Sequence, residues 1–89
     1  MSHFVIIPTF ANNLEAFDNA IQSKFGKKCY KLPRGEWLVS FEGTSKQLSD
    51  ELQISDGTLG VSAIVLNFSG YFGRAGKDIW EWIAVNEKP

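Results

Sequence analysis

Five basic side chains lie close together in the sequence, and phosphate binding is the chemistry that their type and spacing suit best. They fall in residues 24–34, which contain no acidic residue, on a chain whose net charge is −1. The members of this basic cluster are Lys24, Lys27, Lys28, Lys31 and Arg34. Each phosphate that such a side chain neutralises releases counterions, so the pattern indicates a nucleic-acid contact. Tyr30, within the cluster, offers a ring on which a base can stack.

The basic cluster has a second interpretation. Lysines on an edge strand keep that strand from pairing with other chains, and their ammonium groups then remain in solvent and bind nothing. The overall charge does not favour either interpretation, because a chain of net charge −1 is not a polycation that wraps nucleic acid by charge alone.

A glycine-rich segment, residues 69–78, is a second candidate anion site. Arg74 and Lys77 precede a predicted helix, and a helix N-terminus favours an anion. The spacing of the glycines departs from the phosphate-loop motif, and Asp78 stands where that motif has a Ser or Thr. The alternative is a flexible connection without a ligand.

Residues for catalysis are scarce. Cys29 is the only cysteine and His3 the only histidine, so neither a Cys/His zinc site nor a Ser-His-acid triad can be assembled. Cys29 falls in a predicted strand and is interpreted as a small buried hydrophobe. We expect no catalytic residue, no metal and no cofactor. The lone cysteine and the absence of a long apolar segment predict a cytoplasmic protein without a membrane span.

The chain is predicted to be a single α+β domain, residues 1–89, with room for one modest core. A helix is predicted up to Phe25, and a second follows the capping-box spacing of Thr44 and Gln47. Residues 79–85 fit one face of a short helix better than a strand. Strands are predicted at residues 4–7, where Pro8 should end or bend the strand, and at 29–32, 37–41 and 61–68.

This order of elements is the βαββαβ order of a ferredoxin-like sandwich, followed by a short C-terminal element. Two right-handed crossovers would place both helices on one face of a four-stranded antiparallel sheet and leave the other face bare. A bare face rich in aromatic residues on so small a domain predicts a partner, and we expect a second copy of the chain. The candidate dimer contacts are Trp37, Trp80 and Trp82.

Residues 37–52 resemble a known family. They are similar to the third strand and second helix of the small CRISPR-associated integration subunit and of its relatives among virulence-associated and toxin–antitoxin proteins. A Phe-Glu-Gly run followed by a capped helix carries the resemblance, and the element order extends it over residues 3–84. The matching positions are Trp37–Gly43, Thr44, Gln47, Leu48, Glu51 and Leu52.

The resemblance implies a cytosolic homodimer that cleaves phosphodiester bonds. In the family, an Asp at the end of the first strand of each protomer holds a divalent metal. In this chain the corresponding position is Thr9, and the first 14 residues contain no acid. A neutral hydroxyl is a poor ligand for a hard cation. The resemblance therefore extends to the fold and the dimer and not to the nuclease chemistry.

Three functions are compatible with the sequence. The preferred one is a non-catalytic, homodimeric binding module that contacts nucleic acid, RNA or DNA, through the basic cluster. The second is a metal-dependent endoribonuclease of the family type that uses other ligands, although Thr9 counts against it. The third is an antitoxin-like module that binds and blocks another protein.

Overall fold

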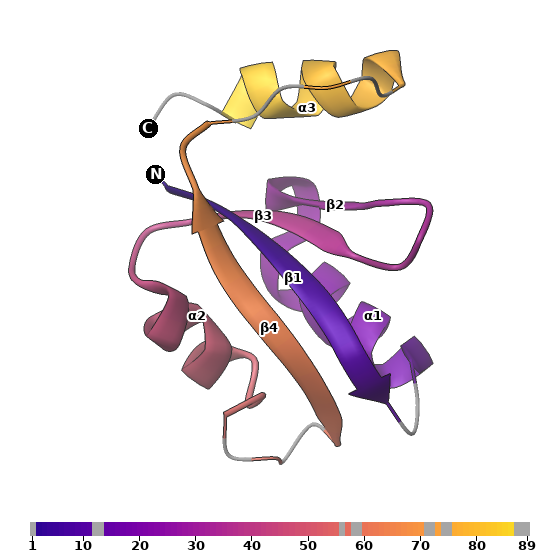
Figure 1. Ribbon diagram of the computed structural model, residues 1–89, viewed down its shortest axis with the longest axis vertical. Helices are drawn as coiled ribbons and strands as arrows, with labels where there is room; N and C mark the ends of the chain where they lie inside the picture. Colours follow the sequence, from indigo (N-terminus) through magenta and orange to yellow (C-terminus); the bar gives the residue numbers. More distant parts are fainter. Residues whose placement is uncertain are drawn as a thin grey trace.

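Four strands form one antiparallel sheet, and three α-helices pack against it in the part of the chain that the structure describes (Figure 1). This computed structural model describes residues 2–11, 14–55, 57, 60–70, 73 and 76–86. The strands are β1 (Ser2–Ala11), β2 (Cys29–Lys31), β3 (Trp37–Phe41) and β4 (Val61–Phe68). The helices are α1 (Leu14–Phe25), the short 3-10 helix η1 (Gly26–Lys28), α2 (Ser45–Glu51) and α3 (Lys77–Asn86).

The sheet has the strand order β2-β3-β1-β4, and every neighbouring pair is antiparallel. The connection through α1 and η1 joins β1 to β2 across the intervening β3. The connection through α2 joins β3 to β4 across the intervening β1. The predicted α+β class with a four-stranded antiparallel sheet is thereby confirmed.

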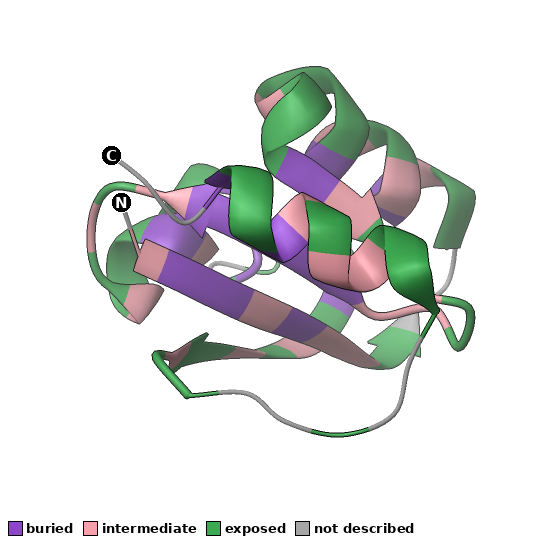
Figure 2. Ribbon diagram, turned by 90° about the horizontal axis from the view of Figure 1, so that it is seen from above, coloured by how far each residue is buried: buried purple, intermediate pink, exposed green. Residues whose placement is uncertain are grey.

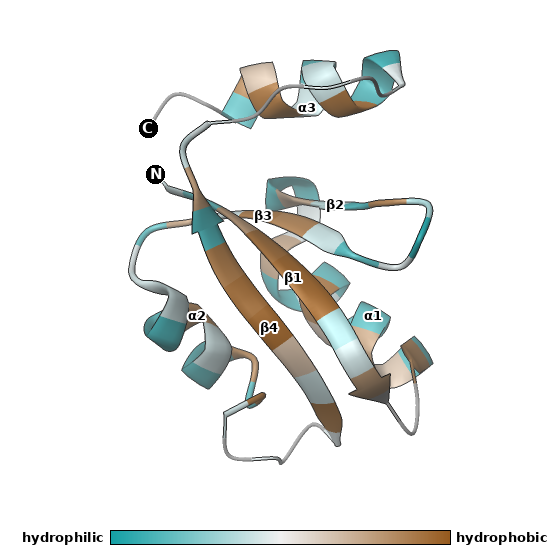
Figure 3. Cartoon of the chain, viewed as in Figure 1, coloured by the Kyte–Doolittle hydropathy of each residue, from teal (hydrophilic) through white to brown (hydrophobic). Residues whose placement is uncertain are grey.

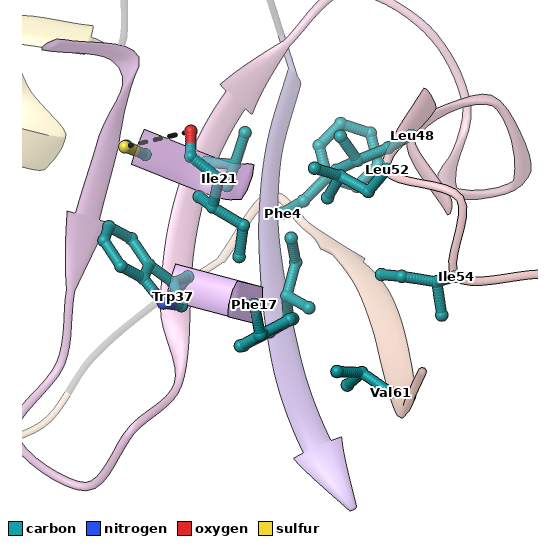
Figure 4. Packing of buried hydrophobic residues seen from close by; sticks show 11 residues of the cluster. Phe4, Phe17, Ile21, Trp37, Leu48, Leu52, Ile54 and Val61 are labelled. Carbon is teal, nitrogen blue, oxygen red and sulfur yellow. Dashed lines mark hydrogen bonds between the residues drawn. The ribbon is translucent and has the colours of Figure 1, made fainter. Parts of the chain in front are cut away.

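Alternate residues of the two central strands form the core on the face that α1 and α2 cover. Phe4 and Ile6 of β1 and Val39 of β3 are completely buried there. They belong to one apolar cluster with residues of both helices (Figure 4). The helix residues in it are Phe17 and Ile21 of α1 and Leu48 of α2, with Leu52 directly after α2. Both helices therefore lie on the same face of the sheet, as predicted.

The ends of these helices follow local chemistry. The Thr44 side chain accepts a hydrogen bond from the Gln47 backbone N–H at 3.1 Å, and the Gln47 side chain accepts one from the Thr44 N–H at 2.8 Å. This is the predicted capping box of α2. Gly26 follows α1 with φ of +50°, a left-handed conformation that favours glycine after a helix.

The first strand is longer than predicted, because it continues through Pro8 to Ala11. Pairing between β1 and β3 ends at Ile6, so beyond that residue β1 has only β4 as a strand neighbour. A proline is tolerated there, since no second strand needs its missing N–H. The predicted bend is present as a register irregularity between Pro8 and Phe10.

The C-terminal segment is a helix, as preferred over a strand, and it changes the expectation of a bare sheet face. In β1, His3 alternates with the core residue Phe4 and so faces away from α1 and α2. Trp82 of α3 contacts the His3 ring with 6.3 Å between ring centroids. Thus α3 lies across one end of the second face, with its exposed residues on the outer side (Figure 2). None of the helices in the described ranges is both long and apolar enough to cross a bilayer.

Candidate nucleic-acid interface

The fold divides the basic cluster, because two of its lysines are paired with acids that are distant in the sequence. Lys31 Nζ lies 2.6 Å from Asp18 Oδ2 on α1. Lys24 Nζ lies 3.8 Å from Glu51 Oε1 on α2, a weaker contact between two exposed groups. Such surface pairs contribute little to stability, but they reduce the positive charge that a phosphate would meet.

Two lysines remain together without an acidic partner among the described residues. Lys27 and Lys28 form the end of η1, and both are exposed. The backbone beneath them is held in place, because Trp82 Nε1 donates a hydrogen bond to the Lys27 carbonyl at 3.2 Å. Tyr30 lies next to the same indole, with 6.2 Å between ring centroids. We call Lys27, Lys28, Tyr30 and Trp82 the basic corner.

His3 holds α3 in place beside the basic corner. Its Nε2 donates to the Asn86 carbonyl at 3.0 Å, across 83 residues of sequence. The His3 ring also stacks on Phe68 at 5.6 Å between centroids. Asn86 is buried, and its amide donates to the Trp82 carbonyl at 3.0 Å. The strand ends thus hold the helix that supports the two lysines, an arrangement that no local pattern in the sequence indicated.

The other predicted basic residues lie apart from this corner or outside the described residues. Arg34 is exposed in the turn between β2 and β3, so the length of β2 separates it from η1. Lys77 is the exposed first residue of α3. Arg74 is outside the described residues. The structure therefore brings two members of the basic cluster together with Tyr30 and places Arg34 elsewhere.

Thr9, where the resembling family has its metal-binding Asp, is exposed at the irregularity in β1. Its hydroxyl donates to the Ser62 carbonyl of β4 at 3.1 Å. Thr9 also lines a surface pocket of about 230 Å³ together with Arg34. The guanidinium of Arg34 disfavours a divalent cation in that pocket, because like charges repel. No group of three or more His, Cys, Asp and Glu residues suited to a metal ion occurs within the described ranges.

The three tryptophans predicted as dimer contacts occupy different environments. Trp37 is a core residue with 4% of its surface exposed, and its Nε1 donates to Asp18 Oδ1 at 2.9 Å. Its alternation in β3 directs it to α1, away from any open surface. Trp82 belongs to the basic corner, and Trp80 is half-buried on α3.

Cys29 is buried, as predicted, and its Sγ donates weakly to the Gly26 carbonyl at 3.2 Å. Burial raises the pKa of the thiol, because a thiolate is poorly solvated in an apolar environment. The side chain therefore lacks the low pKa that a nucleophilic cysteine needs.

Comparison of the chain with protein-family models and with curated proteins gives no match.

Proposed function

We propose that this protein is a non-catalytic binding module that contacts nucleic acid at the basic corner. The observation that carries the proposal is the pair of adjacent exposed lysines on η1, whose backbone is anchored by the Trp82 indole. Two ammonium groups on a fixed turn can neutralise neighbouring phosphates without first ordering a flexible loop. The Tyr30 and Trp82 rings beside them offer apolar surface to a sugar or base.

Part of the same proposal is that the fold is ferredoxin-like. The two interleaved crossovers and the strand order β2-β3-β1-β4 support it. In this interpretation α3 is an addition to the βαββαβ unit, and it builds the binding surface at one end of the second sheet face. A cytoplasmic location, where nucleic acid is accessible, is also part of the proposal.

Fluorescence anisotropy tests the contact directly, with labelled single-stranded RNA and duplex DNA as probes at several salt concentrations. The test variant is Lys27→Ala/Lys28→Ala, which removes two positive charges from the basic corner. We expect weaker binding to the preferred probe, with the slope of log affinity against log salt reduced by about two for duplex DNA.

Lys46→Glu is the matched control, because it also lowers the net charge by two and lies exposed on α2. Affinity that falls equally for Lys46→Glu and for the double variant would refute a specific corner and indicate a general charge effect. Absence of binding to either probe would refute the proposal and favour a protein partner, as in an antitoxin-like module.

A second readout separates binding from cleavage. Each binding sample is run on a denaturing gel after incubation with magnesium or with chelator. We expect an intact probe in both conditions. Cleavage that chelator abolishes would refute the non-catalytic part of the proposal. It would instead support a metal-dependent endoribonuclease of the family type, despite Thr9 at the metal position.

A further inference from the structure

The two outer strands of the sheet differ in how their free edges are protected. At one side, β2 is only three residues long and is flanked by Lys28 and Arg34. Short length and flanking charge are the usual protection of an edge strand. At the other side, β4 is eight residues long and contains neither a charged residue nor a proline. Figure 3 shows β4 as a largely hydrophobic strand beside β1.

The edge of β4 that faces away from β1 has no strand neighbour within the described part of the chain. Among the described strands, only β1 pairs with β4. The Ser62 carbonyl faces β1, because it accepts the hydrogen bond of Thr9. Backbone groups alternate along a strand, so the N–H and C=O groups of Ala63, Val65 and Asn67 face away from β1. These three residues are positioned to pair with one more antiparallel strand.

We infer that the strand that completes this edge is β4 of a second copy of the chain. The pairing is centred on Val65, so that Val65 faces its own counterpart and exchanges both backbone hydrogen bonds with it. Ile64 of one copy then faces Leu66 of the other, and Ala63 faces Asn67. The dimer joins two four-stranded sheets into one continuous sheet related by a two-fold axis.

Two features of β4 favour a second copy over an unrelated strand. An uncharged strand brings no like charges together when it pairs with itself. In the pairing centred on Val65, residues that face each other lie on the same side of the sheet, and Ile64 meets Leu66. These two side chains are 49% and 46% exposed in the single chain.

The core also remains incomplete at this edge. Ala63 and Val65 pack against the apolar cluster from the helix-covered face, but they are only partly buried. A second β4 would place a Val65 beside Val65 and an Asn67 beside each Ala63, which covers that end of the core. This inference moves the dimer contact from the tryptophans to β4, and it does not depend on nucleic acid.

Charge design tests the contact without nucleic acid in the sample. In Ile64→Lys/Leu66→Lys each lysine faces a lysine of the other copy, whereas in Ile64→Lys/Leu66→Glu each lysine faces a glutamate. By light scattering after size exclusion, we expect the native chain and the Lys/Glu variant at twice the 10.0 kDa chain mass. We expect the Lys/Lys variant at the single-chain mass, with a native circular dichroism spectrum.

Val85→Lys is the control, because this side chain is 79% exposed on α3 and lies outside the proposed contact. It should remain a dimer. A native chain that is monomeric at about 100 μM, well above the Kd of a stable homodimer, overturns the inference. A Lys/Lys variant that stays folded and dimeric overturns it equally.

Disulfide cross-linking tests the register. The facing positions 64 and 66 form a non-hydrogen-bonded pair, whose Cα atoms lie about 4.5 Å apart and within disulfide range. Mild oxidation of mixed Ile64→Cys and Leu66→Cys chains should give a covalent dimer in much higher yield than either chain alone. The buried native Cys29 does not compete. Equal yield from Ile64→Cys alone would overturn the pairing centred on Val65.

Discussion

The two faces of the sheet are built differently. On the face covered by α1 and α2, aromatic and aliphatic side chains form a closed cluster, and its largest members are completely buried. On the other face, α3 covers only one end, where His3 and Asn86 are buried and hydrogen-bonded and the apolar Leu38 and Ile83 are also buried. Exposed aliphatic side chains of β4 remain beside it. Most of the buried apolar side chains therefore belong to the covered face, while aliphatic side chains on the second face of β4 remain in solvent.

Truncation of matched leucines is the strongest way to break this comparison. Leu48 is completely buried on α2, and Leu48→Ala should cost about 2–5 kcal/mol of unfolding free energy through lost packing and the cavity that remains. Leu66 is 46% exposed on β4, and Leu66→Ala should cost less than about 1 kcal/mol in the single chain. Urea unfolding at low micromolar concentration measures both.

Similar losses for Leu48→Ala and Leu66→Ala would contradict the division between the faces. Repeating the urea series at a tenfold higher protein concentration separates the contribution of Leu66 within one chain from its contribution to a contact between two copies. The unfolding midpoint of the native chain should rise with concentration if β4 pairs between copies.

Removing the two indole hydrogen bonds also compares the two faces, with smaller expected losses of stability than the leucine truncations. Trp37 donates to the Asp18 carboxylate in a partly buried site, so Trp37→Phe should cost about 1.5–3 kcal/mol. Trp82 donates to the Lys27 carbonyl in an exposed site, so Trp82→Phe should cost about 1 kcal/mol or less. Chemical unfolding followed by circular dichroism measures the two losses.

In the nucleic-acid binding assay we expect the reverse order, with the larger effect for Trp82→Phe. Trp82→Phe should weaken nucleic-acid binding, because the Lys27 backbone loses its anchor, whereas folded Trp37→Phe should bind normally. Asp18→Asn is a useful control, since the amide oxygen still accepts the Trp37 bond while the ion pair with Lys31 is lost. A larger stability loss for Trp82→Phe than for Trp37→Phe would contradict the expectation that contacts on the covered face contribute more to stability than contacts on the second face.

The smallest effect concerns a helix end of the covered face. Thr44→Ala removes the hydroxyl that accepts the hydrogen bond of the Gln47 backbone N–H, and this loss should cost about 1 kcal/mol of unfolding free energy. Thr44→Ser keeps the acceptor oxygen and should be almost neutral. Thermal unfolding measures both, and equal shifts in Tm for alanine and serine would show that the hydrogen bond contributes nothing.

Much of the secondary structure followed from local patterns. The predicted bounds of β3 and β4 agree with the structure, because alternating or continuous apolar residues between turn residues mark a strand directly. The cap of α2 was equally predictable, since its two hydrogen bonds span only three residues. The extension of β1 past Pro8 was not, because it depends on where β3 stops pairing.

The sequence predicted residues of the candidate site but not their spatial arrangement. The basic cluster and Tyr30 were evident in the sequence, but the pairing of Lys31 with Asp18 was not, nor was the contact of Lys24 with Glu51. The helix form of α3 was predicted, yet its contact with His3 spans 83 residues and has no local signal. Trp37 was expected at an interface and lies in the core instead.

The sequence by itself determined where the chain forms strands and helices, because periodicity and capping act over a few residues. Only the tertiary structure decided which lysines keep their charge free, which indole anchors η1 and which strand edge lacks protection. Those properties depend on which segments the crossovers bring together. Charge, burial and backbone pairing at a surface are set by neighbours in space, and these neighbours are distant along the chain.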